Sequence, residues 1–136
     1  MENQASRKLV EEMMVTDVAT VSCLATLRDA MDKMRECRVK SLVVEKRHAS
    51  DAWGIVTYTT ILRTVVQEEG DVDLINVYDI ASKPAVTVPR QLEVRHAVQM
   101  MLDLDIKRVI VSSNNELEGI LTMHDIVSAI LEKVED

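Results

Sequence analysis

The chain contains two copies of one unit, and this repeat restricts its possible folds more than any other feature. A shift of 67 residues aligns identical pairs, including Thr20 with Thr87, Arg28 with Arg95, Met34 with Met101 and Val44 with Val111. The loop at 45–53 is two residues longer than its counterpart at 112–118, so the shift then becomes 65 and aligns Gly54 with Gly119. Two related halves in a chain of 136 residues predict two similar folding units.

Each copy has the same predicted order of elements. Segments rich in β-branched residues at 18–22 ("VATVS") and 85–89 ("AVTVP") predict a first strand. Helical spacing of apolar residues follows at 26–36 and 93–104, as in Leu27, Ala30, Met31 and Met34 and in Val94, Ala97, Val98 and Met101. Two further strands ("SLVVE" and "GIVT"; "RVIVS" and "GILT") and a closing helix at 58–66 or 123–134 complete each copy.

A strand–helix–strand–strand–helix unit leaves one sheet face apolar, and two such faces can bury each other. The sequence therefore predicts an α/β fold of the α+β type, with two pseudo-symmetric β-α-β-β-α units packed sheet to sheet as one domain. The expected boundaries are a tail at 1–7, a first repeat at 8–67, an acidic linker at 68–73 and a second repeat at 74–136. Short helices are expected at about 7–14 and 74–81, ahead of each first strand.

The composition argues against several classes of function. Phe is absent and the only aromatic residues are Trp53, Tyr58 and Tyr78, so no aromatic platform for stacked bases is expected. The net charge of −7 also argues against nucleic acid as a partner. No apolar run approaches the roughly 20 residues of a membrane span, and we expect neither a membrane anchor nor a signal peptide. Cys23 and Cys37 lack metal-ligand spacing, so we expect free thiols, no metal site and a cytoplasmic protein.

The strand-to-helix junctions at Thr57 and Thr122 are candidate ligand sites, because unpaired N–H groups at helix starts bind small ligands. The motif "TMHD" at 122–125 has two interpretations. Asp125 can complete a capping box with Thr122, a pattern that "TLRD" at 26–29 shares. Alternatively, the Asp125 carboxylate can accept hydrogen bonds from both hydroxyl groups of a ribose. The first repeat has Thr60 at this position, which cannot accept bidentately.

A phosphate group on such a ligand would need cations. Each repeat places a lysine just before its second strand, in "VKS" at 39–41 and in "IKR" at 106–108. Lone basic residues there are usually solvated, although their recurrence in both repeats favours a role. No catalytic residues are predicted. His124 and Asp125 are adjacent and point about 100° apart on a helix, whereas His48 falls in a polar loop and His96 on an exposed helix face.

The ordered, repeated motifs resemble a tandem pair of CBS domains (named after cystathionine β-synthase), also called a Bateman module. The resemblance covers about residues 8–134 and rests on "TVSCLATLRDAMDKM" with "TVPRQLEVRHAVQMM", the strands "SLVVE" and "RVIVS", and "GIVTYTTIL" with "GILTMHDIV". The last pair is similar to the family signature of Gly, two apolar residues, Ser or Thr, two variable residues and Asp. The resemblance implies regulatory binding of AMP, ADP, ATP or sometimes S-adenosylmethionine, with no obligatory cofactor.

The family pattern, carried over residue by residue, implies one ligand site. Asp125 would hold the ribose diol, Thr122 and His124 would lie near the phosphates, and Lys107 and Arg108 would contact them. The adenine would be lined from the first repeat by Thr20, Ala25, Val39, Lys40 and Ser41. A weaker second site would comprise Thr57, Thr60, Thr87, Leu92 and Ile106. Its missing carboxylate should weaken a ribonucleotide roughly tenfold to a hundredfold.

We therefore expect a sensor of adenine nucleotides that signals to an unidentified partner protein. Tandem pairs of this kind commonly form homodimers through their helices, and the apolar faces at 26–36, 58–66, 93–104 and 123–134 fit that expectation. The alternative is a ligand-free structural module for dimerisation or interaction, in which Asp125 only caps a helix. An enzyme, such as a small nucleotide hydrolase, is a third hypothesis, but no nucleophile–base pair in the sequence supports it.

Overall fold

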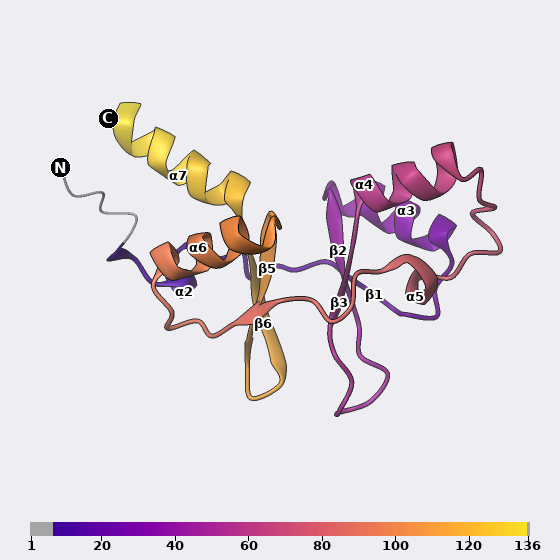
Figure 1. The fold of residues 1–136 in the computed structure, drawn as a ribbon, viewed down its shortest axis with the longest axis horizontal. Coiled ribbons are helices and arrows are strands. Elements are labelled where there is room, and N and C mark those ends of the chain that lie inside the picture. Colours follow the sequence, from indigo (N-terminus) through magenta and orange to yellow (C-terminus); the bar gives the residue numbers. More distant parts are fainter. Residues whose placement is uncertain (1–6, 136) are drawn as a thin grey trace. The chain divides into compact units, whose positions relative to one another are not determined.

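The computed structural model describes residues 7–135, and the chain divides into two compact units. The central unit is Val18–Ala85. The terminal unit combines the described residues of Met1–Asp17 with those of Val86–Asp136. In each unit, Figure 1 shows a small sheet accompanied by helices.

The central unit has a three-stranded sheet in the order β1-β2-β3. β1 (Thr20–Val21) is parallel to β2 (Ser41–Val44), and β2 is antiparallel to β3 (Gly54–Thr57). α3 (Leu27–Cys37) connects β1 to β2, because parallel neighbours need a crossover connection. α4 (Tyr58–Leu62), the π-helical turn η1 (Arg63–Gln67) and α5 (Val77–Ile80) follow β3.

The terminal unit has the same topology, with the sheet order β4-β5-β6. β4 (Thr87–Val88) is parallel to β5 (Arg108–Ser113), which is antiparallel to β6 (Glu116–Thr122). α6 (Val94–Leu104) is the crossover, and α2 (Val10–Met13) and α7 (Met123–Glu135) complete the unit. The predicted order of elements and the mixed α/β class are confirmed.

The closing helices of the two units differ. The sequence predicts a regular helix at 58–66, but α4 ends at Leu62 and continues as the wider turn η1. The N–H of Glu68 donates to the carbonyl of Arg63 at 3.0 Å, and the N–H of Gly70 donates to that of Thr64 at 2.9 Å. These bonds satisfy carbonyl groups at the end of the helix, and Thr64 is buried there.

Aliphatic residues and methionine fill the core of each unit. The crossover helices bury equivalent residues, namely Leu27, Ala30 and Met34 in α3 and Val94, Ala97 and Met101 in α6. Met31, predicted to share the apolar face of α3, is instead 38% exposed. Cys23 is buried and Cys37 is exposed, and both are free thiols as expected.

Both crossover helices end with a residue in the left-handed conformation. Arg38 has φ 56° and ψ 45°, and Asp105 has φ 53° and ψ 47°. In each case the next residue donates its N–H back to the helix, at 3.0 Å after α3 and at 2.9 Å after α6. These equivalent turns lead into β2 and β5, and thereby fix where Ser41 and Arg108 begin the two strands.

Helix α2 packs on the second repeat, although it precedes the first repeat in the sequence. The N–H of Val10 donates to the carbonyl of Leu92 at 2.7 Å. Val15 then pairs with Ile120 of β6 through two backbone hydrogen bonds of 2.9 and 3.0 Å. The segment therefore covers an edge of the sheet that would otherwise leave its backbone groups unpaired.

Helix α5 occupies the equivalent position in the central unit. The N–H of Val77 donates to the carbonyl of Ala25 at 2.8 Å, and Ser82 pairs with Ile55 of β3. Helix α2 is thus bound to the second repeat and α5 to the first, although the repeat pattern assigns α2 to the first and α5 to the second. The compact units therefore exchange these segments relative to the boundaries expected at 8–67 and 74–136.

Candidate functional site

The junction of β6 and α7 brings several predicted ligand-binding residues together within the terminal unit. Arg108, at the start of β5, is the register partner of Thr122, at the end of β6. The N–H of Met123 donates to the Lys107 carbonyl at 2.9 Å, which ties the first turn of α7 to the residue before β5. Asp125 lies in that first turn. The start of one strand, the end of another and the start of a helix therefore meet here.

The carboxylate of Asp125 has no partner within residues 7–135. The N–H of Asp125 donates to Thr122 Oγ1 at 3.0 Å, so Thr122 caps α7, but the carboxylate itself forms no hydrogen bond or ion pair with these residues. The similar motif at 26–29 behaves differently. There, Asp29 Oδ2 accepts from the Thr26 N–H at 3.1 Å and completes the capping box. Capping therefore accounts for Thr122 and leaves the Asp125 carboxylate available.

Arg108 provides a cation at the same junction. Its side chain is partly buried, and its Nε is enclosed without a hydrogen-bond partner in the described structure. Burial lowers the pKa of the Arg108 guanidinium below its usual value, although an arginine remains protonated at physiological pH. An enclosed and charged donor without a partner is unfavourable in the free protein. An anionic ligand group would satisfy it.

The central unit repeats this geometry without the charges. Ser41 is the register partner of Thr57, and the N–H of Tyr58 donates to the Lys40 carbonyl at 3.2 Å. The N–H of Thr60 reaches Thr57 Oγ1 at 3.5 Å, and the two threonine hydroxyl oxygens lie 3.4 Å apart. Neutral residues therefore stand where the terminal unit has Arg108 and Asp125, so a charged ligand would be bound less strongly at this junction.

The residues predicted to line the adenine all belong to the central unit. Thr20 donates its hydroxyl group to Glu45 Oε1 at 3.1 Å, so this group is already engaged. Ala25 and Val39 are partly buried against the central core. Lys40 is exposed and Ser41 is partly exposed. Their contact with a ligand stays a prediction.

The other predicted residues belong to the terminal unit. His124, Lys107 and Thr87 are exposed. Leu92 and Ile106, predicted for the second site, are partly buried against the core of this unit. Among residues 7–135, no cluster of three metal-ligating side chains occurs, and no helix has the length and apolarity for crossing a bilayer.

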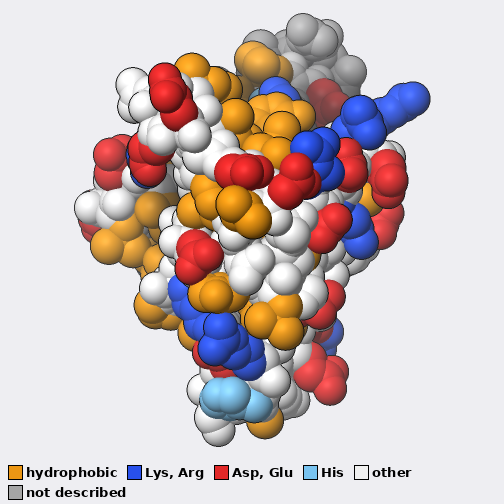
Figure 2. Space-filling model, turned by 90° about the vertical axis from the view of Figure 1, so that its right-hand side faces the viewer, with side chains coloured by type: hydrophobic (Ala, Val, Ile, Leu, Met, Phe, Trp, Pro, Cys, Tyr) orange, Lys and Arg blue, Asp and Glu red, His pale blue; other side chains and the backbone are white. Residues whose placement is uncertain are grey.

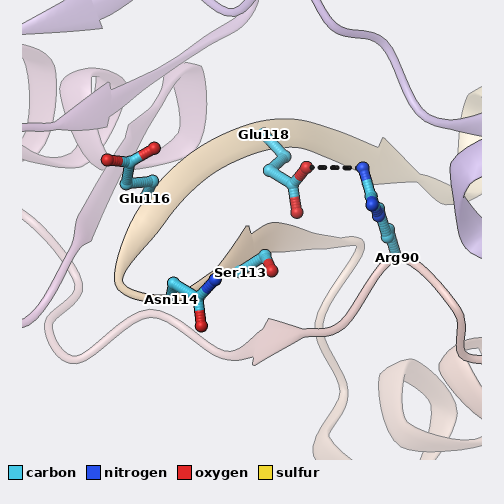
Figure 3. Close-up of a pocket in the computed structure, with 5 residues that line it drawn as sticks. All are labelled: Arg90, Ser113, Asn114, Glu116 and Glu118. Carbon is cyan, nitrogen blue, oxygen red and sulfur yellow. Dashed lines mark hydrogen bonds and ion pairs between the residues drawn. The ribbon is translucent and has the colours of Figure 1, made fainter.

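Two pockets were not predicted from the sequence. One lies in the central unit and is lined by Ser22, Cys23, Leu24, Lys46, Arg47 and Tyr78. The other lies in the terminal unit and is lined by Arg90, Ser113, Asn114, Glu116 and Glu118 (Figure 3). A sequence signal exists for both, because a basic "EKRH" follows the second strand of the first repeat and an acidic "ELE" begins the last strand of the second.

Comparison with known families gives two matches along the chain. The family model described as the CBS domain matches residues 10–67 and again residues 77–132. An uncharacterized protein of Methanopyrus kandleri, MK0525, is 36% identical over 119 residues, which cover 87% of this chain and 60% of that protein. An uncharacterized 33.4 kDa protein of Thermofilum pendens is 28% identical over 131 residues, which cover 89% of this chain and 43% of that protein. The chain thus spans only part of these relatives.

Solved structures show the same fold. A hexameric CBS-CP12 protein from bloom-forming cyanobacteria has a TM-score of 0.85 and 34% sequence identity, covering 93% of this chain and 74% of that one. The CBS domain of a bacterial CNNM/CorC family Mg2+ transporter, solved in complex with ATP, has a TM-score of 0.79 and 20% identity. That match covers 94% of this chain and 90% of the transporter domain. At this identity it supports the fold alone.

Proposed function

Because the chain belongs to the CBS domain family, we propose that it is a regulatory module that senses adenosyl ligands at a site centred on Asp125. CBS pairs are commonly regulatory and bind such ligands. The proposed ligand is AMP, ADP or ATP, with S-adenosylmethionine as a further possibility. The proposed role is regulatory rather than catalytic, and no cofactor is required.

One observation carries this proposal: the terminal unit has an unpartnered carboxylate and an unpartnered, partly buried guanidinium at a single strand-to-helix junction. An ionised carboxylate can accept from both hydroxyl groups of a ribose, which fits Asp125. A guanidinium suits a phosphate, which fits Arg108. A nucleotide carries both groups, so it would satisfy both side chains together.

The proposal predicts one strong nucleotide site. The junction at Thr57 has the same backbone geometry, but Ser41 and Thr60 stand there in place of Arg108 and Asp125. A ligand that binds one state of the module more tightly than another shifts the population toward that state. An unidentified regulated protein would respond to this shift.

The replacement Asp125→Ala tests the nucleotide site. A ligand at a hundredfold excess over its Kd stabilises a protein by about 2.7 kcal/mol, so AMP, ADP or ATP should raise the melting temperature of the wild type. Asp125→Ala should weaken binding by at least about tenfold and so remove roughly 1.4 kcal/mol of this stabilisation. The measurement is a thermal-shift titration with the three nucleotides, S-adenosylmethionine and NAD.

Asp29→Ala is the matched control for that replacement. It removes an aspartate from the same position of a similar motif, where the carboxylate completes a capping box. It should lower the intrinsic stability by about 0.5–1 kcal/mol and leave the nucleotide response intact. The sensor proposal fails if no adenosyl compound shifts the wild type at millimolar concentration. A response that persists in Asp125→Ala would place the ligand elsewhere.

A dimerisation module is the second candidate function, and exposed apolar residues on the closing helices favour it. Leu62 and Val66 of the central unit are 60% and 65% exposed, and Val127 and Leu131 of the terminal unit are 53% and 55% exposed. Large apolar side chains exposed at helical spacing are typical of an interface. We propose a homodimer formed through these helices, which is compatible with nucleotide sensing.

Leu131→Glu tests the homodimer. A carboxylate placed in an apolar interface would be desolvated without a partner, so the variant should sediment as a monomer at concentrations at which the wild type is a dimer. Leu74→Glu, in the segment between η1 and α5 where Leu74 is 78% exposed, is the control and should leave the dimer unchanged. The measurement is analytical ultracentrifugation. A wild-type monomer, or a dimer that tolerates Leu131→Glu, would contradict the proposed interface.

A further inference from the structure

The pocket of the central unit lies away from the nucleotide junction of that unit. It has a volume of about 580 Å³, and its lining residues come from the turn after β1, the loop after β2, and α5. Ser41 begins β2, whereas Lys46 and Arg47 follow its end. A strand advances about 3.3 Å per residue, so the four residues of β2 separate the two places by roughly 13 Å.

Two cations line this pocket, and each lies over an aromatic ring. The Arg47 guanidinium carbon is 5.1 Å from the centroid of the Tyr78 ring, and Lys46 Nζ is 5.1 Å from that of Trp53. The Tyr78 ring orients the Arg47 guanidinium but leaves most of its N–H groups available as donors. On the face drawn in Figure 2, one group of Lys and Arg side chains lies low in the view, just above a His, and other basic side chains lie toward the upper right.

The neighbouring carboxylates of the loop are engaged elsewhere. Asp51 forms an ion pair of 2.7 Å with Lys83 and accepts from the Arg47 backbone N–H at 2.9 Å. These two contacts hold the pKa of Asp51 well below its usual value. Glu45 Oε1 accepts from the Thr20 hydroxyl at 3.1 Å. The guanidinium of Arg47 therefore has no carboxylate partner within residues 7–135.

The equivalent pocket of the terminal unit has the opposite character. Arg90 replaces Cys23 and pairs with Glu118 at 3.2 Å and with Glu11 at 3.6 Å (Figure 3 shows the first pair). Glu11 occupies the position of Tyr78. Their N–H groups make equivalent 3.0 Å hydrogen bonds, to the carbonyls of Arg90 and Cys23 respectively.

In the terminal pocket, the charge of Arg90 is therefore neutralised by the carboxylates of Glu11 and Glu118. Ser113 and Asn114 stand where the central pocket has Lys46 and Arg47, counted from the equivalent strand residues Val44 and Val111. After the pairing of Arg90 with Glu118, the polar group without a partner in this pocket is an acceptor: Glu118 Oε1 is enclosed without a hydrogen bond in the described structure. Within one duplicated fold, one pocket thus has excess positive charge and the other does not.

We propose that the central pocket is a second ligand site, for a small molecule that carries a phosphate group on an apolar or aromatic body. Lys46 and Arg47 would bind the phosphate with charge-assisted hydrogen bonds, and the Ser22 hydroxyl would donate to it. Leu24 is 68% exposed and Tyr78 is 46% exposed, and they would contact the apolar body. A volume of about 580 Å³ is in the range typical of sites for small molecules.

The chain offers its own reporter for this site. Trp53 is the only tryptophan, and its ring lies under the ammonium group of Lys46. A phosphate bound by Lys46 would change the surroundings of that ring. Titration with phenyl phosphate should therefore change Trp53 fluorescence saturably, and it should shift the amide NMR signals of Leu24 and Tyr78. Inorganic phosphate should bind more weakly, and neutral phenol should give no saturable change.

Replacement of the cations locates the binding. Arg47→Gln and Lys46→Gln should each weaken phenyl phosphate by about tenfold, and raising the salt from about 0.1 to about 1 M should weaken it in the wild type. Arg90→Gln, the matched change in the terminal pocket, should leave the affinity unchanged. Titration in the presence of saturating AMP separates this site from the proposed nucleotide site, because AMP would displace a phenyl phosphate bound at Arg108 but not one bound in the central pocket.

Three results would overturn the proposal. One is a wild type in which millimolar phenyl phosphate leaves both Trp53 fluorescence and the two amide signals unchanged. Another is equal binding by the double variant Lys46→Gln/Arg47→Gln. The third is equal binding of phenol, which would show that the phosphate is not recognised. Both basic residues lie in a surface loop and contribute nothing to either core, so the variants should fold.

Discussion

Replacing Gly119 with alanine is expected to destabilise the protein by about 2–3 kcal/mol. A Cβ at this position would lie 2.8 Å from the backbone carbonyl oxygen of Val15 and 2.8 Å from Met14 Sδ. A methionine side chain can move aside, but a carbonyl group moves only with its chain. Val15 is bound to Ile120 by two backbone hydrogen bonds, so the added methyl group should separate this segment from β6.

Gly54→Ala is the matched control, because Gly54 occupies the same position in the first repeat. Its added Cβ would lie 3.3 Å from the Ser82 carbonyl oxygen and 3.3 Å from Val44 Cβ, which a small shift can accommodate. This variant should lose about 1 kcal/mol or less. Urea unfolding measures both losses, and hydrogen exchange at Val15 and Ile120 shows whether the pairing opens. Equal losses in the two variants, with exchange at Val15 unchanged, would contradict the proposed clash.

The repeated pattern of the sequence was sufficient to predict the order of elements but not the exchange of the short helices. The spacing of Leu27, Ala30 and Met34 predicts a buried helix, since an 11-residue helix shows several turns of its apolar face. Helix α2 has only four residues and no comparable face. Its position depends on backbone hydrogen bonds such as that from Val10 to Leu92, which no local pattern encodes. The boundaries expected at 8–67 and 74–136 therefore follow the repeat rather than the packing.

The candidate site was predictable only in part for a similar reason. The motifs at 26–29 and 122–125 look alike, and only the structure shows that Asp29 completes a capping box whereas the Asp125 carboxylate is unpaired. The central pocket was missed because Arg47 and Tyr78 come from a loop and a later helix. Contacts between residues far apart in the sequence leave no periodic signal.

Replacing Arg108 with methionine should have opposite effects on stability and on ligand binding. A bound phosphate would lose a charge-assisted, partly buried partner, so nucleotide affinity should fall by about a hundredfold. Methionine retains much of the side-chain volume but removes an enclosed Nε that has no partner in the described structure. The free protein should therefore be as stable as the wild type, or more stable by about 1 kcal/mol.

Isothermal titration with ATP and urea unfolding without ligand measure the two effects of Arg108→Met separately. Lys107→Met is the neighbouring control: Lys107 is exposed, so its loss should weaken ATP less and leave the stability within about 0.5 kcal/mol. A purely structural Arg108 would give the reverse result, with lower stability and unchanged affinity. A side chain that is unfavourable until a ligand binds is instead what a sensor requires, because ligand binding then has a large effect on the balance between its states.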